Sequence, residues 1–415
     1  MIMFRFDVLQ AKTVREIKTA VKATLAVKYG DKLPSGKGGF ILIKPNLNSN
    51  MNALTGNTTD LRLLAGVIES LKDEGYSNIA IGEGTNSGFY RSGINVISRL
   101  KIDELARRYG VRIIDFNYSG KVDVRFENGI TAHVARECVE AELFINMPKI
   151  KTHFEAGMSV CLKNMMGCLV GQENKKKTHQ SLAANILNLN TFLKPQLHIV
   201  DGVISMEGLG PTRGTPLLTG AIFIGDNPYV IDMVAARLAS TDYRSVRTLA
   251  EAEKRGLLTE EMKRFAEGVA LPRVFSFAPP KAGPIASFIH HPGRQKYFLA
   301  IRNTAFFDKV CSMEIVGKLL FATGLRQDVF IQDEMSVEKL HADTSKCGSC
   351  PQKCADYCPV DLDLPGALKG PIHEKCVSCM YCYLVCPNGA ISFTGKAGFL
   401  DEQLRQYGNI VRKMV

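Results

Sequence analysis

Residues 376–387 read Cys376-Val-Ser-Cys379-Met-Tyr-Cys382-Tyr-Leu-Val-Cys386-Pro387, which is a C-x2-C-x2-C-x3-C-P pattern. In this spacing a tight loop aims the first three thiolates at three irons of one [4Fe–4S] cube, while the fourth cysteine faces another cube. The proline fixes the backbone where the chain turns away. The stretch therefore predicts a small α+β domain of the bacterial ferredoxin type.

A second set of cysteines lies upstream, at Cys347, Cys350, Cys354 and Cys358, and a proline follows the last of them. Its spacing, C-x2-C-x3-C-x3-C-P, has one extra residue between the second and third cysteines, so we expect the loop to bulge there. By the ferredoxin crossover, one [4Fe–4S] cluster would use Cys347, Cys350, Cys354 and Cys386. The other would use Cys376, Cys379, Cys382 and Cys358.

Zinc is the competing interpretation of these cysteines. A zinc ion takes four ligands from paired C-x2-C elements, and eight cysteines with two Cys-Pro closures fit that arrangement poorly. The sequence therefore predicts two [4Fe–4S] clusters, whose proximity would make an electron relay.

Composition sets the class of protein. The chain has 415 residues, of which 46% are hydrophobic and 22% charged, as in a soluble globular protein of two or three domains. Its start lacks the pattern of a secretory signal, and no run of about 18 apolar residues occurs. We expect a cytoplasmic protein, in which clustered cysteines bind metal rather than form disulfides.

The formal net charge of +11 favours acidic partners and anionic ligands. No nucleic-acid-binding signature accompanies this charge, so we expect no nucleic-acid partner. We expect a redox partner protein with an acidic docking surface and an anionic small-molecule substrate. A membrane surface is a less favoured alternative.

The first 240 residues alternate short apolar strands with amphipathic helices, which predicts an α/β fold with a mainly parallel sheet and flanking helices. The expected strands are 40–44, 78–82, 111–115, 143–146, 197–200 and 221–225. The expected helices are 58–73, 92–109, 181–193 and 229–239. Asn57, Thr58 and Thr59 offer N-caps for the first helix, and Asn227 with Pro228 opens the last.

The remaining residues divide into three parts. Residues 241–335 are expected to form a helical, basic cap or extension of the large domain, with helices near 245–255 and 259–267 and a basic, apolar stretch at 297–325. Residues 336–395 would form the ferredoxin-type domain, and residues 396–415 a C-terminal helix. The large α/β domain itself would occupy residues 1–240.

Several segments of the large domain resemble the DUF362 family, whose members often carry a fused 4Fe–4S module. They are Lys44-Pro45-Asn46, Met147–His153, Leu162–Gly167, Asp201-Gly202, Met206–Pro211, Arg213–Pro216 and Asp226-Asn227-Pro228 with Asp232. The resemblance covers residues from about 38 to about 240. It names a family rather than an activity.

Most of these segments lie at or just beyond the end of an expected strand, where open α/β sheets collect their ligands. Lys44, Lys149, Lys151, His153 and Lys163 would form a cationic site for a phosphate, carboxylate or acyl substrate. The candidate catalytic residues are His153, Lys151, Lys149 and Asp201. The candidate substrate-binding residues are Lys44, Asn46, Lys163, Asn164 and Glu207. His153 is the best acid/base candidate because its ordinary pKa lies near neutrality.

Three other features have modest expectations. The glycine-rich stretch 82–88 has one residue too many for a dinucleotide fingerprint, so we expect a tight turn. Residues 175–177 are three lysines without a Walker A frame and predict a mobile charged loop. Cys161 and Cys168 lie in an apolar stretch and are expected to be buried, inert thiols.

Three functions are consistent with these features. The first is an iron–sulfur oxidoreductase component that passes electrons to or from a partner reductase or a substrate on the α/β domain. The second is a non-enzymatic electron carrier whose α/β domain only recognises the partner. The third is a non-redox enzyme with structural clusters.

Overall fold

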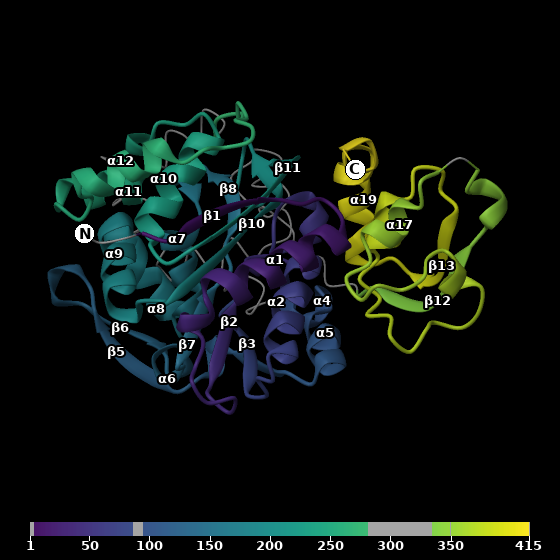
Figure 1. The fold of residues 1–415 in the computed structure, drawn as a ribbon, viewed down its shortest axis with the longest axis horizontal. Coiled ribbons are helices and arrows are strands. Elements are labelled where there is room, and N and C mark those ends of the chain that lie inside the picture. The colour runs from purple at the N-terminus through teal and green to yellow at the C-terminus, as the bar shows by residue number, and fades with distance from the viewer. Residues whose placement is uncertain (1–3, 86–93, 281–333, 349, 415) are drawn as a thin grey trace, which may run out of the picture.

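The computed structural model describes residues 4–85, 94–280, 334–348 and 350–414. Within these residues the large domain is built on a nine-stranded sheet (Figure 1). Its main path runs β1 (Phe6–Gln10), β11 (Thr215–Gly225), β10 (Leu197–Glu207), β7 (Leu143–Asn146), β2 (Ile41–Lys44), β3 (Ile79–Glu83) and β4 (Arg112–Asp115). Two further strands lie off this path: β8 (Lys149–His153) pairs with β10, and β9 (Gly157–Ser159) pairs with β8.

The pairing of the strands confirms the expected α/β class. β10, β7, β2, β3 and β4 pair in parallel, whereas β11 and β1 add two antiparallel strands at one edge. The two expected strands at 197–200 and 221–225 are parts of β10 and β11, which are each 11 residues long. A separate antiparallel hairpin joins β5 (Lys121–Arg125) and β6 (Thr131–Ala135).

Helices cover both faces of the sheet because its strands are apolar on both sides. On β2, Ile41 and Ile43 pack into the core under α1 (Val14–Lys28), α2 (Leu61–Asp73) and α5 (Ile102–Tyr109), while Leu42 packs into the core on the opposite side. The opposite face is covered by α9 (Leu182–Leu193), α10 (Pro228–Leu238), α11 (Arg247–Lys254) and α12 (Glu260–Gly268). The short helices of the domain are α4 (Val96–Arg99), α6 (Glu137–Glu140), α7 (Cys161–Asn164) and α8 (Gly171–Thr178).

Helix starts agree only partly with expectation. Asn227 caps α10 and Pro228 is its first residue, as predicted. The cap of α2 is Asp60, so the predicted cap at 57–59 is wrong. The Thr59 hydroxyl instead makes two buried hydrogen bonds: it accepts from the backbone N–H of Asn46 and donates to the Met147 carbonyl.

Two further predictions about local structure are wrong. Lys101 adopts a left-handed conformation (φ 61°), so the single helix expected at 92–109 is divided into α4 and α5. The lysine run at 175–177 lies within α8 and is not a mobile loop. α11 and α12 occupy the expected helical positions, whereas the basic stretch at 297–325 lies outside the described residues.

The C-terminal module has the expected α+β character. β12 (Ser336–Ala342) and β13 (Ile391–Lys396) form an antiparallel pair, with α17 (Lys353–Asp356) and α18 (Tyr381–Val385) between them in the sequence. The expected C-terminal helix is α19 (Phe399–Met414), and Figure 1 shows it between the large domain and the small module. None of the described helices is long and apolar enough to cross a membrane.

Candidate functional site

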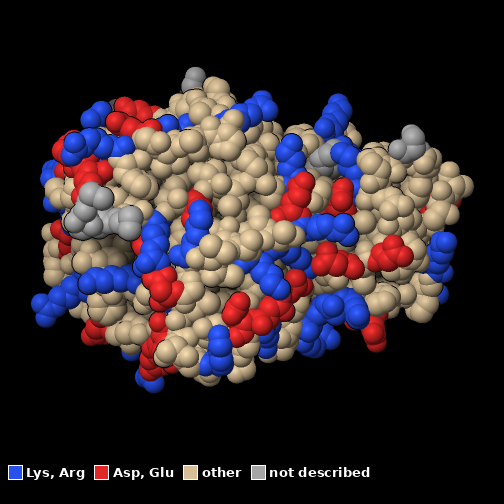
Figure 2. Space-filling model, in the orientation of Figure 1, with Lys and Arg blue, Asp and Glu red and all other residues tan. Residues whose placement is uncertain are grey.

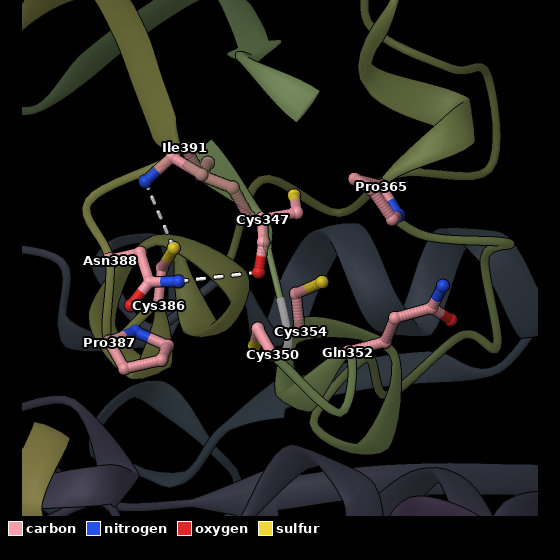
Figure 3. A pocket seen from close by; sticks show the side chains of 10 residues that line it. Cys347, Cys350, Gln352, Cys354, Pro365, Cys386, Pro387, Asn388 and Ile391 are labelled. Atoms are coloured by element: carbon pink, nitrogen blue, oxygen red, sulfur yellow. Dashed lines mark hydrogen bonds between the residues drawn. The ribbon is translucent and has the colours of Figure 1, made fainter. Parts of the chain in front are cut away.

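Four cysteines from different parts of the C-terminal module line one cavity (Figure 3). We call Cys347, Cys350, Cys354 and Cys386 the outer cysteine group. The cavity has a volume of about 360 Å³, including space that is open to solvent. Every residue that lines it belongs to the module. Four thiolates around one space are what a [4Fe–4S] cube requires, so this group fits the cofactor. The set is also the one that the ferredoxin crossover predicts.

The loop that carries the extra residue of the upstream motif contributes to this cavity. Gln352 adopts a left-handed conformation (φ 56°) and lines the cavity beside Cys350 and Cys354. A non-glycine residue rarely adopts this conformation, which turns the chain sharply. Met380 (φ 63°) makes the same turn two residues before Cys382 in the regular motif, so the turn is common to both motifs, and alignment on the third cysteine makes Pro351 the extra residue.

The other four cysteines form a second cluster of sulfurs. We call Cys358, Cys376, Cys379 and Cys382 the inner cysteine group. Burial raises the pKa of Cys379 well above its usual value, and the thiolates of Cys358, Cys382 and Cys376 raise it further. Burial also raises the pKa of Cys382, and the thiolates of Cys376, Cys358 and the outer-group Cys354 raise it further. The four inner sulfurs are thus electrostatic neighbours, and the two groups are adjacent.

Backbone amides donate to several of these sulfurs. The N–H of Ser378 donates to Cys376 Sγ and that of Leu362 to Cys358 Sγ, each at 3.4 Å. In the outer group the N–H of Ala390 donates to Cys386 Sγ at 3.1 Å. Hydrogen bonds to the sulfurs are one of the levers that set the reduction potential of a bound cluster.

Residues beside the inner group contact the large domain. Asn52 Nδ2 donates to the Cys379 carbonyl at 3.2 Å, and the N–H of Leu61 donates to the Tyr381 hydroxyl at 3.2 Å. Arg62 lies over the Tyr357 ring, 4.0 Å from its centroid. The inner group therefore lies at the boundary with the large domain, and the outer cavity is lined by the module alone.

A second polar group lies near the carboxyl ends of the parallel strands in the large domain. Lys44 pairs with Glu83 at 2.8 Å, and Lys149 pairs with Asp201 at 2.9 Å, all with nearly or fully buried side chains. Burial of unpaired charges would be very costly, so each carboxylate offsets one ammonium. Asp201 also accepts from the N–H of Asp60 at 2.6 Å and of Val203 at 3.0 Å.

Lys151 differs from these two lysines because its hydrogen-bond acceptors are neutral. Its Nζ donates to Asn46 Oδ1 at 2.9 Å, Asn48 Oδ1 at 2.6 Å and the Asn57 carbonyl at 2.8 Å. Burial lowers the pKa of Lys151 well below its usual value, and Lys163 and Lys149 lower it further. The three oxygens match the three protons of an ammonium group, so a bound anion would complete the charge balance of this site.

A chain of side-chain amides continues from Lys151 into the core. Asn46 donates to Asn164 at 2.9 Å, Asn164 donates to Asn146 at 2.7 Å, and Asn146 donates to His198 Nδ1 at 3.0 Å. Because each amide both donates and accepts, the chain is polarised in one direction and fixes the acceptors of Lys151.

His153 and Lys163 are the other members of the predicted site. His153 Nδ1 accepts from the N–H groups of Glu155 and Ala156, at 3.1 and 3.2 Å. Burial lowers the pKa of His153 well below its usual value, and Lys163 lowers it further, so the neutral ring carries its proton on Nε2. Lys163 is partly exposed, and burial lowers its pKa too. His153 can therefore donate a hydrogen bond to an anion.

The structure thus gathers most of the predicted site. Lys44, Asn46, Lys149, Lys151, Asn164 and Asp201 are buried together, and His153 and Lys163 interact electrostatically with Lys151. Glu207 lies at the end of β10, where its Oε2 accepts from the N–H of Ala278 at 2.8 Å. We call Lys149, Lys151, His153 and Lys163 with their partners the lysine site.

Comparison with known proteins places these features in two families. A profile described as a domain of unknown function, DUF362, matches residues 41–237. Residues 41–237 are a DUF362 domain. A profile described as a 4Fe-4S binding domain matches residues 371–392, which hold Cys376, Cys379, Cys382 and Cys386. The chain therefore combines a DUF362 domain with an iron–sulfur domain that has electron-transfer capacity.

Two individual proteins are also similar. Thylakoid-associated protein sll1697 of Synechocystis sp. (strain ATCC 27184 / PCC 6803 / Kazusa) is 25% identical over 232 residues, which are 53% of this chain and 69% of that protein. The lactate racemase apoprotein from Thermoanaerobacterium thermosaccharolyticum has 11% identity and a TM-score of 0.35. That match covers 48% of this chain and 50% of the racemase chain.

Several functional partners in the DUF362 domain were not predicted from the sequence. Glu83 belongs to the glycine-rich stretch and pairs with Lys44, and its position at a strand end was the available signal. Lys175 Nζ donates to the carbonyls of Gly84 and Thr85, at 2.9 and 2.8 Å. His198 lies within a buried strand and offers no sequence signal that distinguishes it from a core residue.

Proposed function

We propose that this protein is an iron–sulfur oxidoreductase component that carries low-potential electrons through two [4Fe–4S] clusters. The observation that carries the proposal is the gathering of eight cysteines into two adjacent groups, one open to solvent and one beside the DUF362 domain. When bound, each cluster supplies one-electron transfer. The protein holds the thiolates, donates hydrogen bonds to their sulfurs and separates the two groups into an outer and an inner position.

The outer group is the proposed point of exchange with a redox partner. Its cavity opens to solvent, and the exposed Lys346, which pairs with Asp343 at 3.4 Å, directly precedes Cys347. Acidic and basic side chains are interspersed on the face that Figure 2 shows. We therefore attribute recognition of an acidic partner to local charges at the outer group, with the net charge of +11 adding long-range attraction.

The lysine site is the proposed destination of the electrons. Lys151 and Lys163 would attract an anionic substrate, and His153 would donate from Nε2 to one of its oxygens. Lys149 and Asp201 form a buried ion pair with each other, so together they would add no net charge to the site. A small carboxylate or phosphate ester is the chemical class that such donors bind.

One observation favours the alternative of a non-enzymatic carrier. Lys44, Lys149 and Lys151 are at most 1% exposed, and each is hydrogen-bonded within the protein. Among the described lysines of this site, Lys163 is the more accessible one. In this alternative the DUF362 domain only recognises the redox partner.

Location is also part of the proposal. Clustered cysteines that bind metal rather than form disulfides are typical of a reducing compartment, so we propose the cytoplasm. The relative named as thylakoid-associated makes attachment to a membrane surface the alternative.

Anaerobic titration of the intact protein with dithionite tests the relay directly. Two clusters should accept two electrons per chain, and uptake of one would contradict the relay. The reduced protein is then mixed with small carboxylates and phosphate esters in the absence of any other protein. Reoxidation by one of them identifies an enzyme, whereas reoxidation only by an added acidic redox protein identifies a carrier.

Matched variants separate the same two outcomes. Lys163→Ala and His153→Ala should slow reoxidation by the small molecule while leaving the cluster absorption unchanged. Lys177→Ala is the control, because Lys177 lies on α8 and donates to Thr131 and Asn174. Equal rates in all three variants would exclude the lysine site as the destination.

A further inference from the structure

One segment of the DUF362 domain contacts both the lysine site and the inner cysteine group. It comprises residues 46–62, between β2 and the first turn of α2, and we call it the bridge. Its side chains are almost all buried. The two sites are thus joined by one continuous segment of 17 residues rather than by elements distant in the sequence.

At the lysine site, the bridge supplies the acceptors of Lys151. Asn46 Oδ1, Asn48 Oδ1 and the Asn57 carbonyl all accept from Lys151 Nζ, at 2.6 to 2.9 Å. A change in the charge or position of Lys151 therefore acts on the bridge at three points.

At the inner group, the bridge supplies Asn52. Its Nδ2 donates to the Cys379 carbonyl at 3.2 Å, and its backbone N–H donates to Gln403 of α19 at 2.8 Å. Gln403 in turn donates to the Asn50 carbonyl at 3.1 Å. The peptide that carries an inner-group thiolate is thus hydrogen-bonded to the bridge.

A second connection runs through the start of α2. The N–H of Asp60 donates to Asp201, which pairs with Lys149, and the Asp60 carboxylate pairs with Arg62 at 2.7 Å. Arg62 lies over Tyr357, the residue before Cys358. The N–H of Leu61 donates to Tyr381, the residue before Cys382.

Internal hydrogen bonds hold parts of the bridge together. Asn52 Oδ1 accepts from the N–H of Leu54 at 3.0 Å, and Thr55 donates to the Asn52 carbonyl at 2.7 Å. Ser49 donates to Asn57 Oδ1 at 2.6 Å. These largely buried bonds fix Asn52 to Leu54 and Thr55, and Ser49 to Asn57, within the bridge.

We propose that the bridge couples the reduction state of the inner cluster to the charge of the lysine site. Asn52 is the positioning residue at the cluster end, and Lys151 is the charge at the other. This inference rests on the proposed function, because it requires a cluster on the inner cysteine group. Reduction adds one electron from the outer cluster or from dithionite, and it makes or breaks no covalent bond.

The sign of the coupling follows from electrostatics. The added electron makes the inner cluster more negative, so a proton on Lys151 and the Asn52 N–H dipole at the Cys379 carbonyl both stabilise the reduced state. An anion bound at Lys151 opposes this stabilisation. By reciprocity, reduction weakens anion binding by the same factor. An anion at Lys151 is thus bound more tightly by the oxidised protein than by the reduced protein.

A double-mutant cycle on the intact chain tests the coupling. The midpoint potential of each cluster is measured by redox titration with EPR detection in the wild type, Asn52→Leu, Lys151→Gln and the double variant. The signal that Cys376→Ser alters identifies the inner cluster. Asn52→Leu should lower the reduced-to-oxidised ratio of that cluster about threefold at a fixed potential. Lys151→Gln should act in the same direction, and its effect should be smaller in the Asn52→Leu background.

Asn388→Leu is the matched control. Asn388 Nδ2 donates to the carbonyls of Lys346 and Cys347, at 2.9 and 3.3 Å, so its loss should change the outer cluster and leave the inner one unchanged. Equal effects of Lys151→Gln in both backgrounds would overturn the role of the bridge. If both clusters take up electrons normally but the effects of Asn52→Leu and Lys151→Gln are additive, the coupling is wrong and the proposed function stands.

A measurement on the wild type covers the case in which a variant does not fold. Amide hydrogen exchange is compared between oxidised and dithionite-reduced protein. The coupling predicts changed exchange in peptides that cover residues 46–60 and 149–151. Changes confined to residues 347–390 would overturn it.

Discussion

The side-chain amide of Asn52 donates a hydrogen bond to the carbonyl of Cys379 at 3.2 Å. This contact joins the two domains at the cysteine loop itself, 327 residues apart in the chain. Lys18 of α1 also pairs with Asp361 of the module, and Arg99 lies 5.2 Å from the centre of the Phe399 ring. The iron–sulfur module is therefore packed on the DUF362 domain, and not attached by a linker alone.

Replacing Cys386 tests the exchange of ligands between the two motifs. Cys386 ends the downstream motif but lines the cavity of the outer group. We expect Cys386→Ala to remove or alter the outer cluster and Cys358→Ala the inner one, with about four irons retained in each variant. Iron analysis and EPR check this. Cys138→Ala is the control, since Cys138 lies on α6 in the core of the large domain, outside both cysteine groups. Loss of the same cluster in both variants would contradict the assignment.

Gly167 tests the packing of the buried Lys44–Glu83 pair. A Cβ at this position would lie 1.9 Å from Glu83 Oε1 and 2.6 Å from Lys44 Nζ. We expect Gly167→Ala to lower the free energy of unfolding by about 1–3 kcal/mol, because the pair must shift. Thermal unfolding measures the change. Gly36→Ala is the matched control, where the added Cβ meets nothing within 4 Å. Equal stability of the two variants would show that the pair is not constrained as described.

Arg62 tests the ion pair at the start of α2. Burial opposes the charged forms of both Arg62 and Asp60, but each lowers this cost for the other, so the pKa of Asp60 is lowered and that of Arg62 is raised. We expect Arg62→Met to cost about 3–5 kcal/mol of stability, because it leaves a buried carboxylate without its partner. Denaturant unfolding measures this cost. In the double variant Asp60→Asn/Arg62→Met the cost should be smaller, and an equal or larger cost would argue against a paired charge.

Lys175 makes stability depend on alkaline pH. Burial lowers the pKa of Lys175 to about 8, with Lys44 adding to the effect and Glu83 and Asp115 opposing it. Between pH 8 and about 10.5 the unfolded chain binds the proton more tightly than the folded one, so stability from this group rises with pH by about 3 kcal/mol. Unfolding measured across this range should show the rise in the wild type. It should be reduced in Lys175→Met, and an identical slope in both proteins would refute the assignment.

The sequence predicted the parallel core of the sheet because β2, β3, β4 and β7 are short apolar runs bounded by polar turns. It did not predict β1, which pairs antiparallel to β11 at the edge, because Phe6–Gln10 alternates little and lies far from its partner in the chain. Asp60 was overlooked as the cap of α2 because three earlier polar residues offered the same chemistry.

The candidate site shows the same division. Motif spacing predicted which cysteines meet, since the loop geometry is local. Strand ends predicted that Lys44, Lys149 and Lys151 would gather. Glu83 as the partner of Lys44 and the Asn57 carbonyl as an acceptor of Lys151 could not be predicted, because both approach through tertiary packing. The bridge was not foreseen either, since Asn52 reaches Cys379 only when the module is packed on the DUF362 domain.

The two-cluster relay is tested most directly by counting iron and acid-labile sulfide in the full chain purified without oxygen. Two [4Fe–4S] clusters on the outer and inner cysteine groups predict about eight irons and about eight sulfides per chain. About four of each, or zinc in place of iron, would contradict the account.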